Sequence, residues 1–175
     1  DDEVFLSRVQ KAEDHPGEGP INAVIWTTTP WTLPANQAVA LNPELDYAVV
    51  QAGNERLLLA EALMKDAMGR YDIEDYKVVA YCKGSDLEGV KLHHPFYPYE
   101  VPVILGDHVT TEAGTGAVHT APGHGQEDYV AGARYDLKVD NPVGGDGKFL
   151  PGTPLFEGQH VFKANDSVLD VLRER

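Results

Sequence analysis

The chain has 175 residues, of which 42% are hydrophobic, and this is enough to form the core of a globular domain. Its 28 acidic and 14 basic residues give a formal net charge of −14, which argues against binding along a nucleic-acid backbone but not against holding a short single-stranded end. No apolar run approaches the ~20 residues of a membrane helix, and the single cysteine excludes an internal disulfide.

The order of apolar runs and turn residues predicts a mixed α and β fold. We expect residues 1–20, which end in a Gly/Pro-rich run, to form a linker or lead-in before one domain over residues 21–175. Seven short strands are predicted, at 22–27, 38–41, 47–51, 56–59, 77–82, 101–105 and 116–120. Three helices are predicted, at 61–68, 126–137 and 164–173. Because the strands come in runs, they favour a β-barrel-like core with peripheral helices over a doubly wound sheet.

A threonine-rich peptide follows the first predicted strand. Residues 26–36 read WTTTPWTLPAN, so four hydroxyls lie within six residues, at Thr27, Thr28, Thr29 and Thr32. Hydroxyl groups donate and accept hydrogen bonds, and they can therefore hold a water molecule or a ribose. Asn36 adds an amide at the end of the same peptide.

A second polar peptide, GTGAVHTAPGHGQED at residues 114–128, reads as a strand, a turn and the start of a helix. It places His119, His124 and Asp128 within a short stretch of chain. An ionised Asp128 only accepts hydrogen bonds, which suits recognition of an ammonium group. We expect the two peptides to form two walls of one site.

Other chemistries find less support. A two-histidine, one-carboxylate metal set of His119, His124 and Asp128 stays open, although the helical HExxH spacing is absent. Gly114 and Gly116 lack the third glycine of a dinucleotide fingerprint, and there is no phosphate-binding Gly-Lys-Ser/Thr loop. There is no Gly-x-Ser-x-Gly nucleophile motif. We therefore expect neither a cofactor nor a metal.

Together these peptides resemble the editing domain inserted into class I aminoacyl-tRNA synthetases, and most closely that of bacterial isoleucyl-tRNA synthetase. The likeness extends over residues 21–168 and includes LGDHV at 105–109, KGSDLEG at 83–89, HPF at 94–96, NPV at 141–143 and VFKAND at 161–166. Valyl and leucyl members usually read Thr-Thr-Arg-Pro-Glu/Asp-Thr at this point. In this chain Thr28 and Thr29 are followed directly by Pro30 and Trp31, so there is no arginine, and Trp31 replaces the acidic residue. The synthetase nucleotide-binding motifs are absent, so ATP binding would belong to the full-length enzyme.

The resemblance implies an aminoacyl-tRNA deacylase that hydrolyses mischarged valyl-tRNA(Ile), and possibly valyl-adenylate, while rejecting isoleucine by pocket size. Its partners would be the 3′-terminal aminoacyl-adenosine of tRNA(Ile) and the remainder of the synthetase, in the cytoplasm and without a membrane. No cofactor is implied in this domain. Two alternatives are a metal-dependent hydrolase using His119, His124 and Asp128, and a non-catalytic tRNA-docking module.

The resemblance also assigns roles to individual residues. Asp128 would bind the α-ammonium group of the substrate, and His119 would line the side-chain pocket. The threonines would hold the terminal adenosine and orient the attacking water. The implied catalytic residues are Thr27, Thr28, Thr29 and Asp128, and the implied substrate-binding residues are Trp31, Asn36, His119, Ala121, His124 and Asp128.

Overall fold

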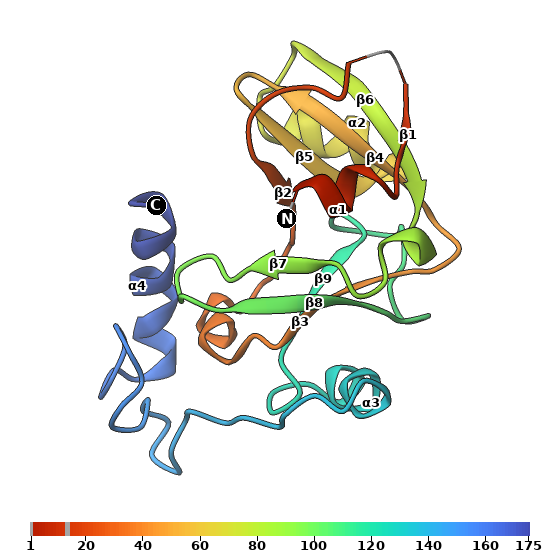
Figure 1. Cartoon of the computed structure of the whole chain (residues 1–175). Helices are drawn as coiled ribbons and strands as arrows, with labels where there is room; N and C mark the ends of the chain where they lie inside the picture. Colours follow the sequence, from red (N-terminus) through yellow and green to blue (C-terminus); the bar gives the residue numbers. More distant parts are fainter. Residues whose placement is uncertain (1, 13–14) are drawn as a thin grey trace. The chain divides into compact units, whose positions relative to one another are not determined.

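The computed structural model describes residues 2–12 and 15–175, and the chain divides into two compact units (Figure 1). Unit 1 consists of Asp1–Trp26, Val39–Leu92 and Pro102–Val118, and unit 2 of Thr27–Ala38, His93–Val101 and His119–Arg175. The α-helices are α1 (Asp2–Leu6), α2 (Glu61–Arg70), α3 (Gln126–Arg134) and α4 (Val161–Arg173). Two 3₁₀ helices are η1 (Pro30–Ala35) and η2 (Gly84–Leu87).

A five-stranded sheet forms the centre of unit 1. Its order is β1-β6-β4-β5-β2, formed by β1 (Gln10–Lys11), β6 (Tyr76–Lys83), β4 (Asp46–Ala52), β5 (Glu55–Ala60) and β2 (Ile21–Ala23). Successive residues of a strand point to opposite faces. On β4, Tyr47 and Val49 therefore join the main core, while Ala48 and Val50 pack with Met68 of α2, which lies across β4 and β5 (Figure 1).

A four-stranded sheet has the order β7-β8-β3-β9, with β7 (Lys91–His93), β8 (Glu100–Leu105), β3 (Ala38–Leu41) and β9 (Ala117–Thr120). Each of these strands contributes residues to both units. The predicted mixed α and β class is confirmed. Among the described residues, the strands form two open sheets and not one closed barrel.

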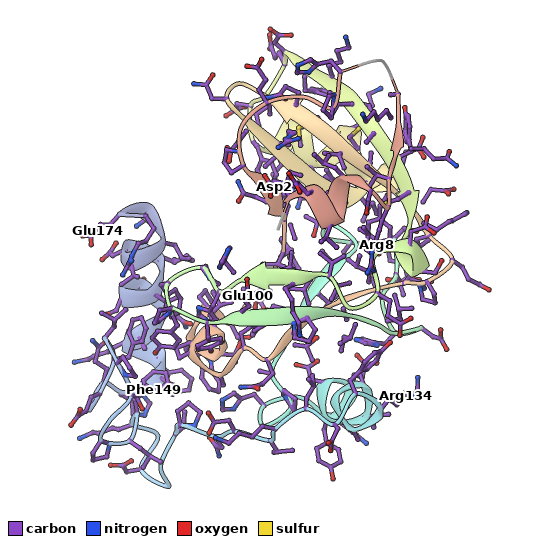
Figure 2. All side chains as sticks on the ribbon, in the orientation of Figure 1. Asp2, Arg8, Glu100, Arg134, Phe149 and Glu174 are labelled. Atoms are coloured by element: carbon purple, nitrogen blue, oxygen red, sulfur yellow. The ribbon has the colours of Figure 1, made fainter. Side chains whose placement is uncertain are left out.

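Unit 2 contains few strand residues, and its core consists largely of packed aromatic side chains and the inner side of α4. Helix α4 packs against η1 (Figure 1), with Val161, Ala164 and Val168 buried on its inner side. Phe149, labelled in Figure 2, lies with its ring centroid 6.0 Å from that of Phe156. The loop at 141–158, predicted from its glycines and prolines, contains only isolated β-bridges.

The proposed boundary between residues 20 and 21 stays a prediction. The described part of residues 1–20 includes helix α1, whose Phe5 is 5% exposed and packs in the core of unit 1, and β1, which pairs with β6. Among the described residues, the structure contains no helix that is both long and apolar enough to span a membrane.

Candidate functional site

The threonine-rich peptide folds as a tight turn followed by the 3₁₀ helix η1. The backbone N–H of Thr29 donates to Oγ1 of Thr27 over 3.1 Å, which closes the turn around Thr28. Pro30 occupies the first position of η1, where a missing N–H costs no hydrogen bond. The Thr32 hydroxyl then donates to the Thr29 carbonyl over 2.9 Å. Hydrogen bonds thus join Thr27 and Thr29 to η1. Thr28 and Thr29 are exposed, and Thr27 is half-buried.

Residues of η1 and its C-cap hold His119, which lies on β9 and is 8% exposed. Its Nε2 is 2.8 Å from Oγ1 of Thr32, and its Nδ1 is 2.7 Å from Nδ2 of Asn36. Both ring nitrogens are therefore engaged by side chains that lie more than 80 positions away in the sequence.

The partners of these groups assign the tautomer of His119. The Thr32 hydroxyl hydrogen is used on the Thr29 carbonyl, so the Thr32 oxygen accepts from Nε2–H of His119. The Asn36 amide nitrogen can only donate, and it donates both to the Ala38 carbonyl, over 2.9 Å, and to Nδ1 of His119. His119 is consequently neutral, with its hydrogen on Nε2.

Electrostatics agree with this assignment. Burial lowers the pKa of His119 from 6.5 to about 4, with further lowering from the nearby His94 and His124. A proton on Nδ1 would also face the donating amide of Asn36. At neutral pH, His119 therefore contributes a fixed, uncharged ring whose nitrogens are both occupied.

Two buried polar atoms in unit 2 have no hydrogen-bond partner among the described residues. One is Oδ1 of Asn36, a residue only 3% exposed, and the other is Nε2 of His124. Buried polar groups are normally hydrogen-bonded, so such atoms are candidates for contact with a bound molecule or water. The ring of His124 meets that of Trp31 edge-on, with 4.9 Å between centroids. Burial lowers the pKa of His124, opposed by the charges of Asp140 and Asp128.

Ala121 connects the second peptide to Asp128. Its backbone N–H donates to Oδ2 of Asp128 over 3.0 Å, and its carbonyl accepts from the N–H of His124 over 2.9 Å. Asp128 is the third residue of α3, and a negative charge is favourable in the first turn of a helix. Ala121 is 1% exposed, which makes its backbone a fixed support for both neighbours.

The structure thus joins Thr32, Asn36 and His119 directly, joins Trp31 with His124, and joins Ala121 with Asp128. Within the part of the chain that it describes, no group of three or more His, Cys, Asp or Glu side chains could hold a metal ion. Sequence reasoning did not identify His94, Tyr99 and Asn165, whose side chains bond the backbone of η1 or its C-cap. The HPF peptide at 94–96, which contains His94, and the VFKAND peptide at 161–166, which contains Asn165, enter the sequence analysis only through their family likeness.

Known proteins have sequences similar to that of this chain. The family model described as "Leucyl-tRNA synthetase, editing domain" matches residues 14–151. An isoleucine–tRNA ligase of Methylococcus capsulatus is 68% identical over 173 residues, covering 98% of this chain and 18% of that protein. One from Thioalkalivibrio sulfidiphilus is 64% identical over 175 residues, covering 100% of this chain and 19% of that protein. The chain therefore spans less than a fifth of the length of these relatives.

Solved structures share the fold. The crystal structure of GlLeuRS-CP1 has a TM-score of 0.71 at 17% identity, covering 99% of this chain and 85% of that one. The editing domain of the P. knowlesi cytosolic leucyl-tRNA synthetase has a TM-score of 0.66 at 10% identity, covering 88% of this chain and 82% of that one. The family-model match covers most of the sequence, and it shows that this chain belongs to the aminoacyl-tRNA synthetase editing-domain family.

Proposed function

We propose that this chain hydrolyses the ester of valyl-tRNA(Ile), and also valyl-adenylate, as the proofreading part of a longer isoleucine–tRNA ligase. The names of the 68% and 64% identical relatives support the isoleucine system. The observation that carries the proposal is the state of His119, a neutral ring held on both nitrogens beside the threonine turn. In this proposal, the remainder of the ligase and the 3′-terminal aminoacyl-adenosine are the partners.

The chemical need is discrimination between two similar side chains. One methylene in an apolar pocket is worth only ~1–3 kcal/mol, a limit for which isoleucine–tRNA ligases are themselves the usual illustration. A second site that excludes isoleucine by size supplies the missing selectivity. Because both nitrogens of His119 are occupied, the ring can offer only its carbon atoms to a bound side chain. That suits a steric role better than acid–base catalysis.

Asp128 would anchor the α-ammonium group of the aminoacyl ester. Its carboxylate is fixed by the Ala121 N–H and by its position in the first turn of α3. A carboxylate and an ammonium group form charge-assisted hydrogen bonds, which are stronger than neutral ones. This contact would hold the ester carbonyl in one place for attack by water.

Hydrolysis would then proceed by direct attack of water on the ester carbonyl. The water oxygen forms a bond to the carbonyl carbon, the bond from that carbon to the ribose oxygen breaks, and the ribose oxygen takes up a proton that the water loses. In this proposal, Thr27, Thr28 and Thr29 orient the water and hold the ribose. Trp31 and His124 form a wall, and Nε2 of His124 is available for a polar contact. No cofactor is required, and we place the reaction in the cytoplasm.

The metal-dependent alternative gains no support from the geometry. Both nitrogens of His119 already bond protein groups, so a metal ion would have to displace Thr32 or Asn36. The non-catalytic docking alternative differs from the proposal in one measurable respect, which is turnover.

The test is deacylation of valyl-tRNA(Ile) and isoleucyl-tRNA(Ile) by this chain, side by side, with and without a chelator. We expect selective loss of valine that the chelator does not change. His119→Ala should extend cleavage to the isoleucyl ester, by about 10- to 100-fold relative to the parent, since one methylene is worth ~1–3 kcal/mol. Chelator-sensitive activity would favour the metal hydrolase. Binding of a non-hydrolysable valyl-adenosine analogue without any turnover would favour the docking module.

A further inference from the structure

The backbone around η1 is held by side chains from other segments of unit 2. The Trp31 N–H donates to Oδ1 of Asn165 over 3.0 Å, Nε2 of His94 bonds the Leu33 carbonyl over 2.9 Å, and the Tyr99 hydroxyl donates to the Asn36 carbonyl over 3.2 Å. A 3₁₀ helix has weaker internal hydrogen bonds than an α-helix, so external contacts matter more for its position.

The loop between β7 and β8, which carries His94 and Tyr99, thus lies beside η1 (Figure 1). His94 is 5% exposed, and its Nδ1 accepts from the N–H groups of Phe96 and Tyr97, over 3.2 and 3.0 Å. An atom that accepts from two N–H groups carries no hydrogen, so the hydrogen of the neutral ring is on Nε2 and is donated to Leu33.

The ring of His94 is also fixed in orientation. It stacks on Tyr97 with 4.9 Å between centroids and 21° between planes, and it meets Phe96 edge-on at 4.6 Å. Burial lowers its pKa, although its bond to Leu33 opposes this shift. His94 is therefore a neutral, immobilised donor that connects its own turn to η1.

The Leu33 carbonyl links His94 to the candidate site. It accepts a second hydrogen bond, over 3.0 Å, from the backbone N–H of Asn36. The side chain of Asn36 in turn donates to Nδ1 of His119. A continuous path of three hydrogen bonds therefore runs from Nε2 of His94 to the ring of His119. Simple filling of the core would not require a hydrogen bond from His94 to this particular carbonyl.

We infer that His94 is a positioning residue, which fixes the Nε2–H tautomer and the orientation of His119 through the Leu33 carbonyl and Asn36. Its kinetic consequence rests on the hydrolysis proposed above, whereas its effect on the His119 tautomer does not. His94 contributes no group to the substrate in this scheme. It determines how the ring of His119 is presented.

Two substitutions separate the two functions of the His94 ring. In His94→Asn, the side-chain oxygen lies near the former Nδ1 and can still accept from the turn, but nothing reaches Leu33. In His94→Gln, the amide nitrogen lies near the former Nε2 and can still donate to Leu33. Ring nitrogen shifts in ¹⁵N–¹H spectra report the tautomer of His119 in each variant, and kcat and KM for the valyl ester report the consequence.

For His94→Asn we expect His119 to populate both neutral tautomers, and kcat to fall about tenfold with KM nearly unchanged, because a small misplacement costs rate more than binding. For His94→Gln we expect the wild-type His119 spectrum and recovery of most of kcat. A wild-type His119 spectrum in the Asn variant, or an equal loss of kcat in both variants, would overturn the inference.

The unmodified protein provides a measurement that does not depend on how the variants fold. Its neutral His94 ring should appear as the Nε2–H tautomer and should titrate below the ordinary histidine pKa, since burial lowers it. An Nδ1–H tautomer, or titration near the ordinary histidine pKa of ~6.5, would contradict the positioning role. Absence of deacylation by the unmodified chain would count against the proposed function alone, because the tautomers are read without substrate.

Discussion

Arg56 in unit 1 and His119 in unit 2 are both buried polar side chains, but most of the partners of Arg56 are backbone groups, whereas those of His119 are side chains. Arg56, 5% exposed, donates to the backbone carbonyls of Gly19, over 2.6 and 3.0 Å, and of Pro16, over 3.1 Å, and it also contacts the exposed carboxylate of Asp2, at 3.5 Å. His119 bonds two other side chains, and one of them, Asn36, keeps a buried oxygen without a partner.

This difference separates residues that support the fold from candidates for function. Arg56 binds the 16–19 segment to β5, and its hydrogen bonds go to carbonyls that would otherwise need water. The hydrogen bonds of His119 instead orient its ring, and Oδ1 of Asn36 stays unpaired, which lowers stability. We therefore expect changes at Arg56 to lower stability without changing activity, and changes at the candidate site to alter activity more than stability at neutral pH.

The largest expected effect is at Asp128. Asp128→Asn keeps an oxygen that can accept from the Ala121 N–H but removes the charge that would hold the substrate ammonium. We expect kcat/KM for the valyl ester to fall about 100-fold or more, since a charge-assisted contact of ~3 kcal/mol corresponds to about that factor. Thermal unfolding should be nearly unchanged.

Glu127→Gln is the matched control, because Glu127 is an exposed acid in the same turn of α3. It should retain full activity. Wild-type kcat/KM in Asp128→Asn would remove Asp128 from the mechanism, and an equal loss in both variants would indicate a general effect of charge.

The second effect concerns pH and His119. Its pKa is depressed in the folded protein, to about 4 from 6.5, so it favours folding at neutral pH, and this contribution is lost as pH falls from 6.5 towards 4. The full shift corresponds to about 3 kcal/mol. Urea unfolding of the parent and of His119→Gln, at pH 7 and pH 4.5, should show that the stability of the variant depends less on pH.

His94 and His124 also have lowered pKa values, so the parent alone cannot identify the titrating group. Both proteins in the comparison retain His94 and His124, so the difference between them reports mainly the titration of His119 and its coupling to these two rings. If the two stability curves run parallel between pH 7 and pH 4.5, His119 is not held neutral by its surroundings.

A smaller effect, on stability only, is expected at Arg56. Arg56→Met keeps most of the buried aliphatic volume but removes the hydrogen bonds to the carbonyls of Gly19 and Pro16 and the 3.5 Å contact with Asp2. We expect a loss of about 2 kcal/mol in the free energy of unfolding. Values of kcat and KM for the valyl ester should remain those of the parent. A fall in kcat without loss of stability would show that Arg56 contributes to activity, and the contrast between Arg56 and His119 would then be wrong.

The sequence predicted the regular elements well because their signals are local. Strand β3 was predicted at its observed bounds, and β4, β5, β6, β8 and β9 differ from prediction by one residue at one or both ends. The C-terminus of α3 was placed at residue 137, but the helix ends at Arg134, and Asp136 has a positive φ of 55° that a helix does not accommodate. The first strand was predicted to reach Thr27 but ends at Ala23.

The site was less predictable because its contacts are distant in sequence. Four clustered threonines and two histidines indicated a polar site, and the structure does bring Thr32 to His119. Helix η1 was missed, since its two prolines break any helical period while still allowing a 3₁₀ turn. The bond from His94 to Leu33 joins positions 61 residues apart, and no local pattern encodes it.

The smallest predicted effect tests whether a hydrogen bond from a distant side chain also positions Trp31, as we propose for His119. Oδ1 of Asn165, on α4, accepts from the Trp31 N–H, and the Trp31 ring contacts His124. Asn165→Leu should cost about 1 kcal/mol of stability, the worth of one neutral hydrogen bond, and raise KM for the valyl ester severalfold. Asn165→Asp retains an accepting oxygen and should keep KM close to that of the parent. If the Asp and Leu variants raise KM equally, Asn165 supports Trp31 by packing and not by its hydrogen bond. In that case the orientation of rings by hydrogen bonds, argued for His119, would not extend to the contact between α4 and Trp31.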